Sequence, residues 1–351
     1  MSTRQAALLA LATAVPPYRL EQSAVADLAR RVYAKSFVRY PKLADIYINA
    51  GIEQRFSARP LDWFETPHDW PERTKAYIEG ASALFIEAAQ TALTRAGLHA
   101  RDVDVVVTIS STGIATPSLE AVVGTQMGFR PDALRVPVFG RGCAGGVVGL
   151  SLGARLARAE PGDVVLVVVV ELCTLAFRAD RSTKADVISS ALFGDGAAAV
   201  VLRAGEEQEA DLTIGATAEH TWPSTLDIMG WTMDPLGFGV VLSRSLPRFI
   251  EQRLAAPVRR FVKRAALTAP QLVCHPGGAK VLDAVETALA LQKGTLRDER
   301  ELLRTHGNMS APSVLFVLER ALKRGLRGPT LLSAMGPGFT VCFAALENAH
   351  G

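Results

Sequence analysis

The sequence predicts an α/β protein in which helices and sheets pack in layers, built from two duplicated halves. Segments typical of strands alternate with helical segments, and the same order of elements recurs in the second half with similar spacing. Of the 351 residues 49% are hydrophobic but only 7% are aromatic. Small and aliphatic side chains therefore fill the core, as expected of closely packed layers.

The first half alternates strands and helices. Residues 103–110 (VDVVVTIS) and 164–170 (VVLVVVV) are apolar and rich in β-branched side chains, which is typical of strands covered on both faces. Residues 147–159 predict a helix that Pro161-Gly162 ends, and residues 197–202 predict another strand.

The second half repeats this order. Residues 270–278 (PQLVCHPGG) predict a strand and a turn, and residues 279–291 predict a helix. Residues 307–325 predict a second helix ended by Gly325. Residues 329–347 predict two strands joined by a Gly-Pro-Gly turn.

One register overlays the halves. Gly142-Cys143 falls on Gly307-Asn308, strand 105–111 falls on 270–275, and the Gly194-Asp195-Gly196 turn falls on Gly336-Pro337-Gly338. The separation from Ser111 to Cys143 is 32 positions (143 − 111), and that from His275 to Asn308 is 33 (308 − 275). We therefore predict two similar halves, residues 1–205 and residues 206–351. A pseudo-twofold axis between them brings Cys143, His275 and Asn308 together.

Composition excludes several classes of protein. The net charge of +3 is too small to indicate a nucleic-acid partner, and no run of Lys and Arg predicts a basic stripe. No apolar run reaches the roughly 18 residues of a membrane span. The opening ALLALATAV predicts a first strand that ends at Pro16-Pro17 rather than a signal peptide. We expect a cytoplasmic protein.

The four cysteines, Cys143, Cys173, Cys274 and Cys342, lack any CxxC pairing. Neither a disulfide framework nor a metal site is predicted. Cys143 differs from the others because it lies in the glycine-rich GRGCAGG, just before a predicted helix. A helix N-terminus lowers the pKa of a thiol, so Cys143 is the candidate nucleophile. Gly145 and Gly146 are expected to make a sharp turn and leave room for an acyl group.

His275 and Asn308 are the candidate partners of Cys143. A histidine stabilises a thiolate as imidazolium or, when neutral, donates an N–H to a carbonyl oxygen. An asparagine at this point either donates to a substrate oxygen or caps the following helix. Asp195, between two glycines, is predicted to be structural.

Five motifs occur in the order found in chalcone synthase-like enzymes. They are GCAGG (142–146), ALFGDGAAAVVL (191–202), HPGG (275–278), GNMSAPSVLFVLE (307–319) and GPGFT (336–340). Over nearly its whole length the chain thus resembles the type III polyketide synthases. The resemblance implies the thiolase fold, with five layers (αβαβα), and a homodimer.

The resemblance also implies a reaction. Cys143 takes a starter acyl group from its CoA thioester and is kept ionised by His275. His275 and Asn308 hold the thioester oxygen of malonyl-CoA, which loses carbon dioxide to give the enolate that attacks the acyl group. No metal or redox cofactor is implied. The implied substrate contacts are Phe193, Phe238, Ser111, Thr112, Thr116, Cys173, Ala176, Lys280, Ser310, Gly336, Pro337 and Gly338.

Two segments depart from the family pattern. Glu53 stands where a lysine that contacts the CoA phosphates is expected. Lys280 is a candidate replacement, and its alternative is an ordinary solvated helix residue. In the segment LCTLAFR (172–178), Cys173 and Ala176 are smaller or less polar than the threonines common in plant relatives. A less polar wall favours alkyl chains, by about 0.8 kcal/mol per buried methylene.

We therefore expect a medium- or long-chain fatty acyl starter and an alkylpyrone or alkylresorcinol product. The alternatives are an aromatic starter, or malonyl-CoA alone giving a hydroxylated naphthalene or phloroglucinol. The alternative enzyme is a ketoacyl synthase III served by an acyl-carrier protein, which would need a basic docking patch that the sequence does not predict. The non-enzymatic alternative is a paralogue that has no catalytic activity and only scaffolds a partner.

Overall fold

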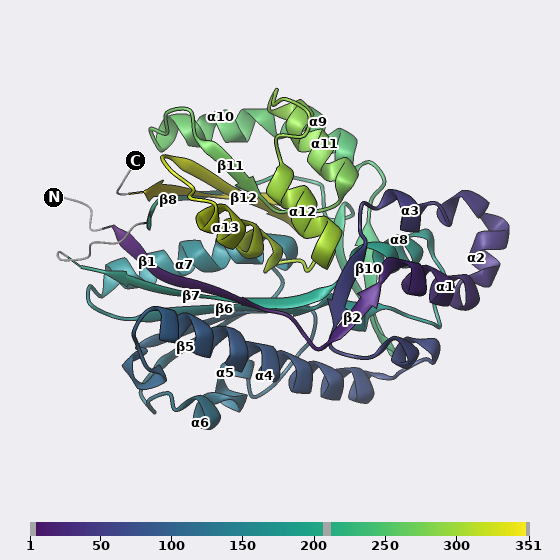
Figure 1. Ribbon diagram of the computed structural model, residues 1–351, viewed down its shortest axis with the longest axis horizontal. Helices are drawn as coiled ribbons and strands as arrows, with labels where there is room; N and C mark the ends of the chain where they lie inside the picture. Colours follow the sequence, from purple (N-terminus) through teal and green to yellow (C-terminus); the bar gives the residue numbers. More distant parts are fainter. Residues whose placement is uncertain (1–4, 206–211, 349–351) are drawn as a thin grey trace.

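Two matching sets of strands organise the chain (Figure 1), which the computed structural model describes over residues 5–205 and 212–348. The strands are β1 (Ala6–Ala14), β2 (Tyr18–Glu21), β3 (Gln54–Ser57), β4 (Val105–Ile109), β5 (Leu134–Val138), β6 (Val165–Leu172), β7 (Asp195–Ala204), β8 (Leu212–Thr221), β9 (Met229–Asp234), β10 (Gly237–Leu242), β11 (Gln271–Cys274), β12 (Thr330–Gly336) and β13 (Thr340–Asn348).

Helices connect and cover these strands. They are α1 (Gln22–Val32), α2 (Ala34–Arg39), α3 (Ile46–Asn49), α4 (Trp70–Arg95), α5 (Leu119–Val122), α6 (Gly124–Met127), α7 (Gly145–Ala159), α8 (Lys184–Leu192), α9 (Leu246–Arg253), α10 (Ala255–Arg264), α11 (Ala279–Ala288), α12 (Arg297–His306) and α13 (Ser313–Lys323). Short 3₁₀ turns include η1 (Pro41–Leu43), η4 (Gly142–Ala144) and η5 (Cys173–Ala176).

The strand order repeats between the halves. The first half runs β5-β4-β6-β7-β1 and the second runs β11-β12-β13-β8. In each, one parallel pair (β4–β6 or β11–β12) is followed by two antiparallel pairs. The predicted overlay is confirmed, because β4 and β11 take equivalent places, as do β7 and β13. A short antiparallel pairing of β1 with β8 joins the two halves into one nine-stranded sheet.

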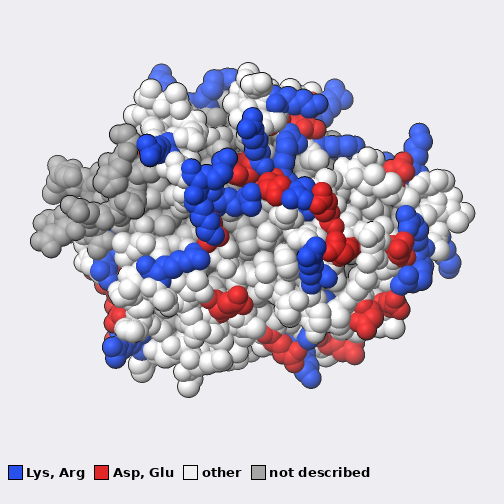
Figure 2. Space-filling model, in the orientation of Figure 1, with Lys and Arg blue, Asp and Glu red and all other residues white. Residues whose placement is uncertain are grey.

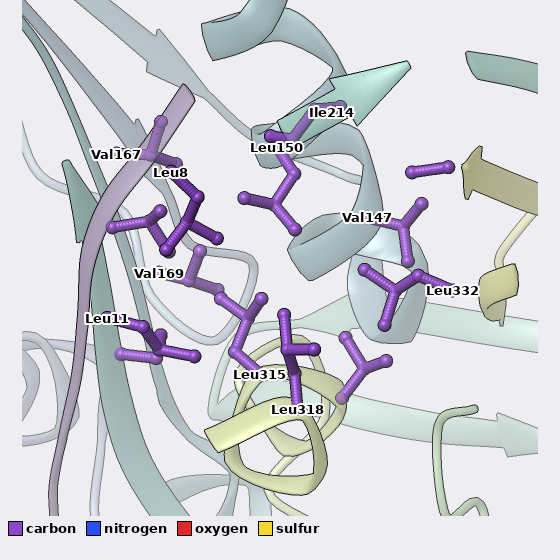
Figure 3. Close-up of a cluster of buried hydrophobic side chains, with 14 of the residues drawn as sticks. Leu8, Leu11, Val147, Leu150, Val167, Val169, Ile214, Leu315, Leu318 and Leu332 are labelled. Carbon is purple, nitrogen blue, oxygen red and sulfur yellow. The ribbon is translucent and has the colours of Figure 1, made fainter. Parts of the chain in front are cut away.

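Five layers result. Helices α7 and α13 lie between the two sets of strands, α4 covers the outer side of the first set, and α9, α10 and α11 cover the outer side of the second (Figure 1). Figure 3 shows the middle layer, where Leu150 of α7 and Leu315 of α13 meet side chains from both sets of strands, such as Val167 and Leu332. Strand β6 is buried at every residue, as its β-branched sequence predicts for a strand covered on both faces.

Two details differ from the prediction. Strand β7 begins at Asp195, so the predicted Gly-Asp-Gly turn is partly strand. Gly145 and Gly146 are the first residues of α7 and make no sharp turn. A Cβ on Gly146 would lie 2.4 Å from the carbonyl oxygen of Ala311, so the glycine allows α7 and α13 to approach closely. The predicted boundary after residue 205 adjoins residues 206–211, which lie outside the described residues.

In the described ranges, no helix is both long and apolar enough to cross a membrane. The cytoplasmic location stays a prediction.

Candidate active site

The matching elements of the two halves end around one cavity of about 540 Å³. Cys143 reaches it from the start of α7, His275 from the end of β11, and Asn308 from the segment before α13. The structure thus brings together three residues of which the first and last are 165 positions apart (308 − 143). The duplicated fold is the reason, because the α7 and α13 N-termini lie side by side in the middle layer.

Cys143 lies in η4, one turn before α7, and its side chain is buried. The backbone N–H of Gly142 donates to Ser111 Oγ at 3.1 Å, which holds the loop from the β4 side. From the other half, the loop at Pro337 packs so closely that a Cβ on Gly142 would lie 2.7 Å from Pro337 Cδ. The hydroxyl of Ser310 donates to Cys143 Sγ at 3.4 Å. Both halves therefore position the thiol.

Burial raises the pKa of the Cys143 thiol to about 11, and the Ser310 hydroxyl offsets this only in part. The expected lowering of this pKa is wrong for the free enzyme. Desolvation of a thiolate in a closed apolar site outweighs the favourable field of the helix N-terminus. The nearby Glu171 carboxylate raises the pKa further.

His275 directly follows β11, and its backbone N–H donates to the carbonyl of Ser333 at 3.0 Å. Its ring is buried, and burial lowers its pKa to about 3. Neither ring nitrogen has a hydrogen-bond partner among the described residues. Near pH 7 the ring is therefore neutral and offers one N–H donor and one acceptor to the cavity. Burial of the two groups therefore favours a neutral thiol and a neutral imidazole over the thiolate and imidazolium that the resemblance implied.

Asn308 does not cap α13, whose N-cap is Pro312. Its Oδ1 accepts from the backbone N–H of Ser310 at 2.8 Å, and its Nδ2 donates to the carbonyl of Gly277 at 3.2 Å. These bonds fix the amide against the HPGG turn. A side-chain amide has two N–H donors, so one stays available to a substrate oxygen.

Several predicted contacts line the cavity beside these three. They are Cys173, Phe193, Lys280, Ser310 and Pro337. Phe193 forms a short parallel bridge with Asn308, which ties the end of α8 to the site. Gly336 and Gly338 flank Pro337 outside the lining. A Cβ on Gly336 would lie 2.6 Å from the carbonyl oxygen of Arg141, so this loop shapes the site through close packing.

Other predicted contacts lie elsewhere. Phe238 on β10 packs against Trp70, with ring centroids 5.0 Å apart, and does not line the cavity. Ser111 and Thr112 lie behind the Cys143 loop, where the Thr112 hydroxyl donates to Glu171 Oε2 at 2.7 Å. Ser111 holds the loop, and neither residue lines the cavity. Thr116 is exposed and outside the cavity.

Ala176 borders a small second pocket of about 30 Å³ that lies against the main cavity. The two share three lining residues, Cys173, Phe193 and Val240. Asp195, predicted to be structural, accepts from the backbone N–H groups of Ala58 and Thr174 at 2.8 and 2.7 Å. It is buried away from the cavity, so the structure agrees with that prediction.

Two parts of the site were not predicted from the sequence. One is the β9–β10 hairpin, whose Met229, Trp231, Val240 and Leu242 form an apolar wall. The Asp-Pro-Leu-Gly turn between the two short strand sequences is the main local signal for this hairpin. The other is Glu171, buried behind Cys143, whose pKa burial raises to about 7. Its Oε1 has no partner among the described residues.

Three exposed cations, Lys42, Arg244 and Lys280, line the mouth of the cavity. None forms an ion pair with another described residue. Glu53, the departure from the family pattern, pairs instead with Arg304 on the surface. The positive charge at the mouth therefore comes from other positions than the family pattern suggested.

Comparison with known proteins agrees with this geometry. Residues 69–206 match the family model described as chalcone and stilbene synthases, N-terminal domain, and residues 214–346 match the C-terminal domain of the same family. The chain belongs to this family, the type III polyketide synthases. It is therefore an acyltransferase that condenses malonyl-CoA.

Individual relatives cover almost the whole chain of this polyketide synthase. It is 37% identical to a 1,3,6,8-tetrahydroxynaphthalene synthase of Streptomyces peucetius subsp. caesius, over 98% of this chain and 93% of the relative. It is 32% identical to a putative chalcone synthase of Bacillus subtilis, over 95% and 96%. The crystal structure of 1,3,6,8-tetrahydroxynaphthalene synthase from Streptomyces coelicolor superposes with a TM-score of 0.91 at 26% identity, over 97% and 99% of the chains.

Proposed function

We propose that this polyketide synthase is primed by a medium- or long-chain fatty acyl-CoA and extends it with malonyl-CoA to an alkylpyrone or alkylresorcinol. The observation that carries the proposal is the apolar lining of the cavity that Cys143 enters. Its side chains are Ile188, Leu192, Phe193, Met229, Trp231, Val240, Val241 and Leu242. Such a lining stabilises methylene groups and gives few donors to the carbonyls of a long, unreduced polyketide.

The second pocket supports an alkyl starter. It lies beyond Cys173 and Phe193, and most of its side chains are apolar, among them Leu20, Val25 and Leu28. A chain attached to Cys143 can place its end there only if the residues at the entrance are small. Cys173 and Ala176 meet that condition. The small volume favours a medium chain over a long one.

In the proposed first step, Cys143 Sγ attacks the starter thioester. The Sγ–acyl bond forms, the acyl–CoA bond breaks, and the thiol proton passes through neutral His275 to the sulfur of CoA. Because burial keeps the resting thiol protonated, this transfer must accompany the attack. The unpartnered nitrogens of His275 are free to accept and return that proton.

In the extension step, an N–H of His275 and the free N–H of Asn308 hold the thioester oxygen of malonyl-CoA. Carbon dioxide leaves, and the two donors stabilise the enolate oxygen that forms. The enolate carbon then attacks the acyl carbonyl, and Cys143 leaves as a thiolate. Lys42, Arg244 and Lys280 are placed to hold the phosphates of CoA at the mouth.

Competition among hexanoyl-, lauroyl-, palmitoyl- and coumaroyl-CoA at equal concentration, with malonyl-CoA present, tests the starter. We expect hexanoyl- or lauroyl-CoA to dominate the products. Ala176→Leu should fill the second pocket and shift preference to the shorter starter, whereas Ala176→Ser, of nearly unchanged size, should not. If most product comes from coumaroyl-CoA, or if Ala176→Leu does not change the preferred chain length, the proposed alkyl starter is wrong. The family assignment is unaffected.

A second candidate rests on the Streptomyces peucetius relative, named for 1,3,6,8-tetrahydroxynaphthalene. Such a product needs malonyl-CoA alone. Incubation with malonyl-CoA and no starter distinguishes the two. A naphthalene product formed as fast as the alkyl product in the presence of lauroyl-CoA would favour this candidate.

We also propose a homodimer through the edge of the first half. Strand β5 ends the nine-stranded order, and an end strand offers unpaired backbone groups. Exposed apolar side chains surround it, namely Ile114, Val122, Leu134 and Phe139. Thr116 lies in the same segment. Sedimentation at micromolar concentration should give a dimer, and Leu134→Asp should weaken it; a wild-type monomer would refute the proposal.

A further inference from the structure

Seven of the 38 Lys and Arg residues lie close together in the sequence, on α9 and α10 and just before them, and α9 borders the cavity. Between residues 244 and 264 there are seven basic residues and one acidic residue, Glu251. The rest of the chain has 31 Lys and Arg (38 less 7) and 34 Asp and Glu (35 less 1), so it is net negative. We define the basic surface as Arg244, Arg248, Arg253, Arg259, Arg260, Lys263 and Arg264. The sequence-based expectation of no basic stripe is therefore wrong.

All seven side chains of the basic surface are exposed. None forms an ion pair with a residue that the structure describes. Most cations of α12 and α13 differ, since Arg304 pairs with Glu301 and Lys323 with Glu319. Figure 2 shows blue and red side chains intermingled where Figure 1 places α12 and α13, and blue ones along the upper edge over α9 and α10. Exposed cations without an ion pair also occur elsewhere among the described residues, such as Arg101, Arg297 and Arg327, but the basic surface gathers seven of them within 21 residues.

The position of the basic surface indicates a large ligand. Arg244 lines the cavity mouth, and Leu246 and Ile250 of α9 line the cavity itself. Helix α9 extends roughly 12 Å and α10 a further 15 Å at 1.5 Å per residue. The phosphates of one CoA molecule need only the three cations at the mouth. Charge along both helices suits an acidic macromolecule.

The packing of the two helices argues against membrane insertion. Their apolar side chains, Leu246, Ile250, Leu254, Val258 and Phe261, are buried in the core against β11–β13 and α11. No large hydrophobic side chain of α9 or α10 is exposed. An interfacial membrane helix would need that apolar face free. A protein partner needs only the charged side.

We propose that the basic surface docks an acidic carrier protein whose phosphopantetheine arm delivers the starter acyl group to Cys143. The inference rests on the proposed priming of Cys143. It replaces acyl-CoA with the carrier protein as the donor of the starter acyl group. Sγ of Cys143 attacks the carrier's thioester, the Sγ–acyl bond forms, the acyl–pantetheine bond breaks, and the proton of Cys143 ends on the pantetheine sulfur. Malonyl-CoA remains the extender.

The test compares lauroyl-carrier protein, a bacterial fatty-acid carrier loaded with lauroyl-phosphopantetheine, with lauroyl-CoA. The variant R259E/R260E/K263E lies on α10, away from the cavity lining. The control R101E/R297E/R327E makes the same change in net charge at three exposed, unpaired arginines elsewhere. Acylation of Cys143 is followed by intact mass, and circular dichroism checks that both variants fold.

We expect the α10 variant to lose about tenfold or more in acylation rate from the carrier, because opposite charges steer association. Its rate with lauroyl-CoA should stay within about twofold of wild type, and the control should change neither by more than that. An equal loss in the control, or acylation by lauroyl-CoA with none from the carrier, overturns the inference and leaves the proposed function intact. The inference is also overturned if the protein binds anionic vesicles, the α10 variant abolishes this binding, and the variant still takes the acyl group from the carrier. Failure with both donors overturns the proposed function instead.

Discussion

The two halves of the molecule place different chemistry at the same point of one fold. The first half carries the sulfur nucleophile Cys143 before α7, and the second carries the amide of Asn308 before α13. Neither residue is the N-cap of its helix. Equivalent backbone positions around a pseudo-twofold axis thus give convergent side chains, and the two halves need not share the identity of those side chains.

The burial of the two positions teaches a second point. Cys143 and Asn308 are both nearly inaccessible, but only a titratable group changes its chemistry on burial. The thiol becomes a weaker acid, and the imidazole of His275 becomes a weaker base. The amide stays a donor at any pH. The site therefore combines one group that must exchange a proton with another that never does.

The largest expected effect tests the first-half position. Cys143→Ala should abolish polyketide formation, since the mutant has no atom to carry the acyl group. Cys342→Ala, a buried cysteine outside the cavity, is the matched control and should retain turnover. Product analysis by mass spectrometry and a melting curve measure both. Turnover in Cys143→Ala would contradict the assignment.

The second-half position should matter for one step only. Asn308→Ala should slow malonyl-CoA decarboxylation roughly a hundred- to a thousandfold, the usual loss for one oxyanion donor. Acyl transfer to Cys143 should be much less affected. Release of labelled carbon dioxide and intact mass separate the two steps. Decarboxylation at the wild-type rate would show that the amide does not hold the enolate.

The contact between the halves can be broken sterically. Gly146→Ala places a methyl group 2.4 Å from the carbonyl oxygen of Ala311 and 2.7 Å from Val314 Cγ1. Overpacking of this kind should lower the free energy of unfolding by about 1–3 kcal/mol. Gly124→Ala, where no atom lies within 4 Å, should not lower it. Urea denaturation measures both variants, and equal stabilities would mean that α7 and α13 separate easily.

A further test concerns protonation of His275. Its pKa falls from 6.5 to about 3 on folding, so the folded state binds fewer protons than the unfolded state between these values. The contribution to stability is full above pH 6.5 and is lost as pH falls toward 3. His275→Gln should therefore flatten the fall of the unfolding free energy in this window by about 1.4 kcal/mol per pH unit. Equal slopes in wild type and variant would place the ring in solvent.

Much of the fold followed from local pattern. The β-branched run of β6, the glycine and proline breaks and the repeated order of elements were enough to predict the layers and the overlay of β4 on β11. The same repeat predicted that Cys143, His275 and Asn308 approach one another. These features depend on periodicity and spacing, which are properties of the chain itself.

Other features depend on which distant segments meet. The pKa values of Cys143 and His275 follow from desolvation, and the sequence alone predicted the wrong direction for the thiol. Phe238 matched a motif position but packs on Trp70, and the apolar wall of the cavity comes from a hairpin with little local pattern. The packing of α9 and α10 buries their apolar sides, and this decides that their basic side chains form one exposed surface. Sequence determined which chemical groups this protein has, and tertiary structure decided which of them lose water and face the same cavity.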